Sequence, residues 1–186
     1  MIPIEVFFSA LVFVFALIGL VRGFLRELGV TTIMMFLLFF LSLFEPELDR
    51  GLMRVMDSGG GLMSGADENL IKCGIFTFVI IGSAFVSYEG ETLAFGGRLQ
   101  SGTQALTLGL LTGTLNGYLI AGSLWYYMDK FGYPFEVLGF SVQSLSAIAQ
   151  KMIEFLPMTF LGRPVLFGQS LLLYLSALLL LARVIR

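Results

Sequence analysis

The sequence predicts an all-α, polytopic integral membrane protein with four to five transmembrane helices and one interfacial amphipathic helix. Hydrophobic residues make up 57% of the 186 residues, charged residues only 13%, and the mean hydropathy is +0.91. A soluble protein could not cover so much apolar surface without associating. In lipid, only helices and closed barrels satisfy the backbone, and the apolar runs do not alternate with polar residues as barrel strands do.

Five apolar segments are long enough to be candidate spans, because a hydrocarbon core of about 30 Å requires about 20 mostly apolar residues in a helix. We expect one membrane domain over 1–186, with spans at residues 4–21, 28–44, 70–88, 105–128 and 164–182. The connection RGFLRE between the first two spans demands a tight antiparallel hairpin. The second connection, residues 45–69, is acidic and contains three consecutive glycines, which predicts a flexible loop.

A less apolar helix is expected between the fourth and fifth spans. In residues 137–156, apolar side chains recur at spacings of three or four, while Gln143, Lys151 and Glu154 fall on another face. This pattern predicts an amphipathic helix that ends at Pro157. The segment is too polar to span comfortably, so a position in the membrane interface is favoured over an extramembrane helix packed on a partner.

Arginines near the spans predict the orientation of the chain. Arg22 and Arg26 lie in the first hairpin, Arg183 and Arg186 follow the last span, and five spans place both groups on the same side. We expect that side to be cytoplasmic, with the N-terminus outside, in the cytoplasmic (inner) membrane of a bacterium. Several basic residues fall on the outer side in this arrangement: Arg50, Arg54, Lys72, Lys130, Lys151 and Arg163.

The fourth span contains a small residue at every fourth position, a pattern that we call the glycine ribbon. It predicts a tight helix–helix interface, because small side chains let two backbones approach closely in lipid. The second helix can belong to this chain or to another protein. The ribbon consists of Ala105, Gly109, Gly113, Gly117 and Ala121.

Three polar residues in or beside the spans are candidate contact sites. Asn116 lies near the middle of the fourth span, where a carboxamide needs a partner. An interhelical hydrogen bond is favoured over the lining of a translocation path, because none of the five apolar cores contains a charged residue. Arg22 and Arg26 are four residues apart and should share a helix face. They either anchor the chain at lipid phosphates or bind an anionic partner or lipid.

The sequence predicts no catalytic, metal or cofactor site. The chain has no histidine, the commonest general base and metal ligand, and Cys73 alone forms neither an intrachain disulfide nor a thiolate metal site. The net charge of −2 and the lack of a basic stripe argue against nucleic acid. The expected partners are membrane lipids and other integral membrane proteins, or further copies of the same chain.

Two stretches resemble the colicin V production protein family (CvpA). ALIGLVRGFLREL, residues 16–28, resembles its opening hairpin, and residues 108–131 resemble its glycine-rich fourth span. Asn116 and Gly117 stand where the family commonly has an arginine-glycine pair. The resemblance implies four spans and an outer amphipathic helix, with a role in toxin export and envelope maintenance. The hairpin positions that match are Arg22, Gly23, Phe24, Arg26 and Glu27.

Two functions are therefore expected. The first is a non-enzymatic integral membrane scaffold or accessory subunit that packs against other membrane proteins through the glycine ribbon and the fifth span. The second is a component of a transport or export system, with a polar path lined by Asn116, Gln104 and Gln169.

Overall fold

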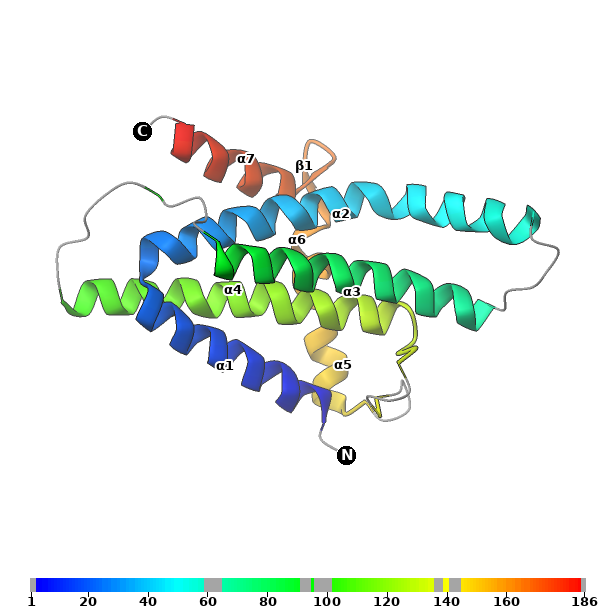
Figure 1. The fold of residues 1–186 in the computed structure, drawn as a ribbon, viewed down its shortest axis with the longest axis horizontal. Coiled ribbons are helices and arrows are strands. Elements are labelled where there is room, and N and C mark those ends of the chain that lie inside the picture. Colours follow the sequence, from blue (N-terminus) through cyan, green and yellow to red (C-terminus); the bar gives the residue numbers. More distant parts are fainter. Residues whose placement is uncertain are drawn as a thin grey trace.

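The computed structural model is an elongated helical bundle (Figure 1). It describes residues 3–58, 65–90, 95, 102–135, 139–140 and 145–184. The long helices are α1 (Ile4–Arg22), α2 (Phe24–Ser58), α3 (Gly65–Glu89) and α4 (Thr103–Lys130). The C-terminal elements are α5 (Ala147–Ile153), α6 (Pro157–Leu161), β1 (Pro164–Leu166), β2 (Gln169–Ser170) and α7 (Leu171–Val184).

The four long helices are each long and apolar enough to cross a membrane, which makes the chain a multi-pass membrane protein. Each of the first four predicted spans lies within one of these helices. With a rise of 1.5 Å per residue, even the shortest of them, α1, extends about 28 Å, close to the thickness of the hydrocarbon core. The predicted fold class is therefore confirmed.

Helix α4 is the centre of the bundle. It packs against α1, α2, α3 and α6, and Figure 1 shows it running along much of the molecule between the other spans. The main core lies where α2, α3 and α4 meet, and Met34, Phe76 and Leu119 are buried there. The rings of Phe76 and Tyr127 stack with their centroids 4.1 Å apart. This core fixes three spans. Leu172 of α7 is also buried in it, whereas α1 packs mainly on α4.

The flexible loop predicted for residues 45–69 is wrong over most of its described length, because α2 continues to Ser58 and α3 begins at Gly65. Glu, Leu, Arg and Met dominate this part of the sequence, and all are good helix formers. An ion pair between Glu47 and Arg50, three residues apart on α2, adds local support. The glycine run that suggested a loop falls in residues 59–64, outside the described residues.

The amphipathic helix predicted for residues 137–156 is much shorter in the structure. Its described helical part is α5, because Gly139 has a positive φ of 69°, which a right-handed helix does not contain. The helix begins where the Ser146 side chain accepts a hydrogen bond from the backbone N–H of Ala149. Pro157 does not end this helix but starts α6, at a position where a missing N–H is tolerated. Residues 136–138 and 141–144 lie outside the described part.

The fifth span predicted for residues 164–182 is wrong over its first seven residues, which form a β-hairpin. Phe167 and Gly168, the two residues of its loop, have positive φ angles of 48° and 74°, as in a type I′ turn. The apolar helix that follows, α7, has only 14 residues. Its length of about 21 Å falls short of the hydrocarbon core, and it packs along α2.

Candidate functional site

The glycine ribbon of α4 lies against α1 of the same chain. A Cβ added to Gly113 would lie 2.5 Å from the carbonyl oxygen of Phe15, and one added to Gly117 would lie 2.9 Å from the Cα of Val12. Gly19 supplies the facing surface on α1, where an added Cβ would lie 2.7 Å from the Cα of Gly113. The two backbones are therefore in contact, and the ribbon is covered by α1 along these turns.

The remaining ribbon residues mark the two ends of this contact. An added Cβ on Gly109 would lie 3.6 Å from the Cα of Gly23, so the turn between α1 and α2 also rests on α4. Ala105 is half-buried and Ala121 is buried. Gly23 alone separates the two helices, with a φ of 85°, so the hairpin is tighter than the six-residue connection that the sequence suggested.

A buried polar cluster joins three spans close to this turn. Glu27 lies in the first turn of α2 and its side chain is 0% exposed. The Nδ2 atom of Asn116, on α4, donates to Oε2 of Glu27 at 2.8 Å and to the Glu27 carbonyl oxygen at 3.0 Å. The Tyr88 hydroxyl, on α3, donates to the same Oε2 at 2.9 Å. One carboxylate therefore binds α2 to both α3 and α4.

Thr31 completes the set of partners around Asn116. Its hydroxyl lies 2.7 Å from Oδ1 of Asn116 and 3.0 Å from the carbonyl oxygen of Glu27. Asn116, with no exposed surface, thus has partners on both its amide nitrogen and its oxygen. The interhelical hydrogen bond expected for Asn116 is confirmed. Gln104 and Gln169, the other residues of the expected polar path, are both exposed, in the first turn of α4 and in β2.

The two arginines of the hairpin have different surroundings. Arg22 ends α1, with its Nη1 atom 3.4 Å from Oε1 of Glu27, its guanidinium 4.5 Å from the centre of the Tyr88 ring, and its side chain 18% exposed. Arg26 lies in the first turn of α2 and is exposed. The expectation that both share one helix face is wrong, because the helix is interrupted at Gly23.

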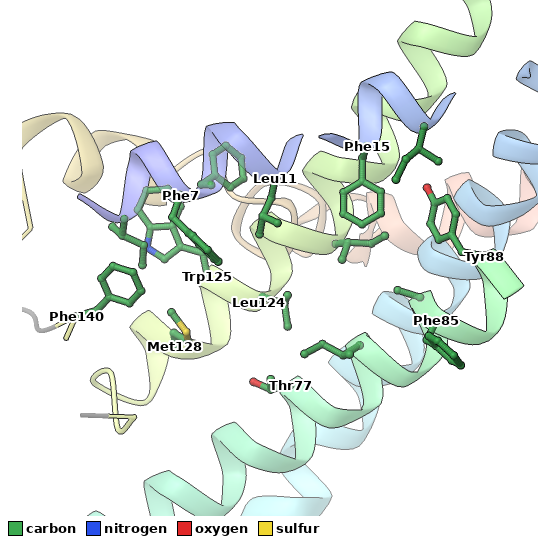
Figure 2. A pocket seen from close by; sticks show the side chains of 16 residues that line it. Phe7, Leu11, Phe15, Thr77, Phe85, Tyr88, Leu124, Trp125, Met128 and Phe140 are labelled. Atoms are coloured by element: carbon green, nitrogen blue, oxygen red, sulfur yellow. The ribbon is translucent and has the colours of Figure 1, made fainter. Parts of the chain in front are cut away.

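An apolar groove of about 860 Å³ lies between α1 and α3, with α4 as its floor. Figure 2 shows Leu11 and Phe15 of α1 on one side of it and Thr77 and Tyr88 of α3 on the other. Tyr88 places the polar cluster at one end. The opposite end is lined by Ile4, Trp125, Met128 and Phe140.

A second polar group closes that opposite end. Nε1 of Trp125 donates to the Tyr133 hydroxyl at 3.0 Å, which in turn donates to Oδ1 of Asp129 at 3.1 Å. Burial raises the pKa of Tyr133, which lies after the end of α4, so this phenol remains a neutral donor at physiological pH. The chain of donors holds the only tryptophan in the sequence in a fixed position.

Ion pairs fix the charged end of α2 to its neighbours. Nζ of Lys72, on α3, lies 2.7 Å from a carboxylate oxygen of Asp49 and 2.5 Å from one of Glu68, and its side chain is 8% exposed. Lys130, the last residue of α4, pairs with Glu45. These contacts join α2, α3 and α4 at the end of the bundle opposite the α1–α2 turn (Figure 1).

Sequence reasoning did not identify the partners of Asn116. Glu27 falls in the turn between two predicted spans, and nothing in the local pattern distinguishes Tyr88 or Thr31. A partial signal was present, because a carboxamide in mid-span needs a partner and Glu27 is one of several acidic residues next to a predicted span.

The described part of the chain contains no group of three or more His, Cys, Asp or Glu side chains that could hold a metal ion. No family model matches the chain, and neither a curated protein nor a solved structure matches it. The resemblance to the CvpA family therefore stays a prediction from two stretches of sequence.

Proposed function

We propose that this chain is a non-enzymatic integral membrane scaffold or accessory subunit. The observation that carries the proposal is the length of α2, whose 35 residues extend about 52 Å, some 20 Å more than a hydrocarbon core requires. Residues 24–44 are almost entirely apolar after the first turn, and the charged residues begin at Glu45. Residues 45–58 of α2, together with the start of α3, form a projection that we call the stalk.

The stalk is held in place by the ion pairs of Lys72 and Lys130. A partner that binds a rigid surface orders fewer groups than one that binds a flexible loop, so less of the interaction free energy is lost on association. Its exposed charges, such as Glu47 and Arg50, suit a polar contact in the aqueous phase. The partner is another integral membrane protein or a second copy of this chain.

The proposed location is the cytoplasmic membrane of a bacterium, with the stalk outside. Figure 1 shows the α1–α2 turn and the C-terminal end of α7 at the same end of the bundle, away from the stalk. Arg22, Arg26 and Arg183 therefore gather at one end. We assign that end to the cytoplasm because Arg22 and Arg26 flank the first span, which usually dominates the positive-inside rule. The N-terminus then lies outside, at the same end as the stalk.

Site-specific photocrosslinking in intact cells tests the scaffold function. A photoreactive amino acid at Glu47 or Arg50 should give discrete protein adducts, identified by mass spectrometry as one partner or as the chain itself. The same amino acid at Phe36, exposed on the apolar part of α2, is the matched control and should give lipid adducts. The proposal would be refuted if the stalk gave no protein adducts and the protein purified as a monodisperse monomer without a partner after mild detergent extraction.

Orientation is tested separately with single cysteines and a membrane-impermeant maleimide. Glu47→Cys should react from outside intact cells, and Thr103→Cys, exposed at the arginine-rich end, should react only after permeabilisation. Cys73 is buried and gives a low background. The opposite labelling pattern would reverse the orientation without affecting the scaffold function.

A further inference from the structure

The groove between α1 and α3 is apolar along its length and has a charged group at one end. Its lining on α1 runs from Ile4 to Ile18, which is about 21 Å at the rise of a helix. Thr77 and Tyr88 supply its hydroxyl groups, and that of Tyr88 is already hydrogen-bonded to Glu27. The groove therefore suits a long apolar ligand whose polar part lies at an end.

The charged residues at the Tyr88 end include a partly exposed arginine. Arg22 rests on the Tyr88 ring, and only one long contact of 3.4 Å links its guanidinium to Glu27. Arg26 lies at the same end, in the turn that contains Glu27. Glu89, exposed directly after Tyr88, lies at this end as well, so the formal charges of the two arginines and the two glutamates cancel. The guanidinium of Arg22, which one long contact links to Glu27, nevertheless presents paired N–H donors of the kind that bind phosphate oxygens.

The walls of the groove suit a flexible chain better than a transmembrane helix. Helices pack closely in lipid through small residues, whereas this groove is lined by Phe7, Leu11, Phe15 and Phe85 (Figure 2). The small residues that would receive a helix are those of the glycine ribbon, which α1 already covers. An acyl chain can bend between bulky side chains and needs no hydrogen-bond partner.

We propose that the groove binds one phospholipid, with its phosphate at Arg22 and one acyl chain between α1 and α3 over α4. The phosphate end of this site lies at the opposite end of the bundle from the stalk, and the proposal goes beyond the scaffold function. A bound phospholipid would brace α1, which otherwise packs mainly along the glycine ribbon.

Photolabelling in nanodiscs locates the lipid. Phosphatidylglycerol with a diazirine on one acyl chain should label Leu11 and Ile81, in the groove, several-fold more than Phe36 and Phe40, on the outer face of α2. Unlabelled phosphatidylglycerol should compete away only the groove signal. Equal labelling of both faces would show ordinary annular lipid and overturn the proposal.

Lipid binding by two matched variants tests the proposed position of the acyl chain. Leu11→Trp places a large ring in the middle of the groove. Phe13→Trp places the same indole ring on the exposed face of α1, outside the groove. Native mass spectrometry should show loss of one retained phospholipid from Leu11→Trp and none from Phe13→Trp. The same lipid count in both variants would contradict a site in the groove.

The phosphate contact is tested with Arg22→Gln and with three probes. Phosphatidylglycerol should bind this variant about tenfold more weakly than the unmodified protein, because a charge-assisted contact is removed. Diacylglycerol with the same acyl chains should bind the unmodified protein about as weakly as phosphatidylglycerol binds Arg22→Gln. Inorganic phosphate should not displace phosphatidylglycerol from the unmodified protein. Diacylglycerol binding as tightly as phosphatidylglycerol would overturn the assignment of the phosphate. A photoreactive amino acid placed at Leu11 should give lipid adducts in intact cells, and a protein adduct there would instead assign the groove to a partner helix and overturn the proposal. Should Arg22→Gln fail to fold, the comparison of the two tryptophan variants still decides the matter.

Discussion

Replacing Asn116 with leucine should destabilise the bundle by breaking the buried polar cluster that joins α2, α3 and α4. The substitution keeps a side chain of similar size but removes both amide donor interactions with Glu27 and the acceptor for Thr31. The side chain is fully buried, so water cannot replace these partners. The Glu27 carboxylate would keep the Tyr88 hydroxyl and the long contact with Arg22.

The size of the effect follows from the hydrogen bonds that this substitution removes. Interhelical hydrogen bonds in membrane proteins contribute about 0.6 kcal/mol on average and about 1.7 kcal/mol at most. A buried acceptor that is left without its donor costs about 1–3 kcal/mol, and more where it is charged. Asn116 makes three such hydrogen bonds, and one of them is to a carboxylate. We therefore expect the free energy of unfolding to fall by about 2–3 kcal/mol.

Reversible unfolding in mixed detergent micelles measures this decrease, with the emission of the buried Trp125 as the signal. Thr114→Ala is the matched control, because Thr114 is exposed on α4 and its hydroxyl bonds only to the carbonyl oxygen of Leu110 on its own helix. The control should change the free energy of unfolding by less than about 0.5 kcal/mol. If Asn116→Leu behaved like this control, the cluster would not hold the spans together.

Three further changes test other parts of the structure. Gly113→Ala should lower the free energy of unfolding by about 1–3 kcal/mol in the same assay, because its Cβ would meet the backbone of α1. Gly82→Ala is the control and should be neutral or stabilising, because nothing lies within 4 Å of its added Cβ. Equal effects of the two substitutions would contradict the close α1–α4 contact. Burial raises the pKa of Tyr133 above its unfolded value of about 10, so its contribution to stability should be complete below pH 10 and decline as the pH rises further. A Tyr133→Phe variant should lose stability less steeply above pH 10, and an unchanged alkaline profile would count against it. Lys72→Met should increase amide hydrogen exchange in the stalk, because the carboxylates of Asp49 and Glu68 would lose the cation that pairs with both. An exchange rate equal to that of the unmodified protein would mean that these ion pairs do not make the stalk rigid.

The sequence was sufficient for the spans and insufficient for the segments between them. Hydropathy located the four long helices because a hydrocarbon core imposes a minimum apolar length. It could not show that α2 continues past Pro46, since glycine and acidic residues nearby also fit a loop, and ion pairs to Lys72 and Lys130 come from other helices. The hairpin at Phe167 and Gly168 was missed because its apolar residues also fit a membrane helix.

The candidate site was likewise only partly predictable from the sequence. The demand of Asn116 for a hydrogen-bond partner follows from its sequence position alone, but the identity of that partner depends on how α2 and α4 face each other. Glu27 is 89 residues away, and no local pattern relates the two. The groove could not be predicted from the sequence, because it forms only where α1 and α3 both pack on α4 and leave a space between them.

The hairpin that resembles the CvpA family can be explained by packing alone. Gly23 provides the positive φ of the turn, so a side chain is disfavoured there by backbone conformation, although an added Cβ would meet nothing within 4 Å. Glu27 joins α2 to α3 and α4, and Arg22 balances its charge while it lies on Tyr88. Since these conspicuous residues hold the spans together, a contact with another molecule must use what remains accessible. Among the described residues, the accessible features at this end of the bundle include the partly exposed Arg22, the exposed Arg26 and the groove beside them, and those at the other end include the charges of the stalk.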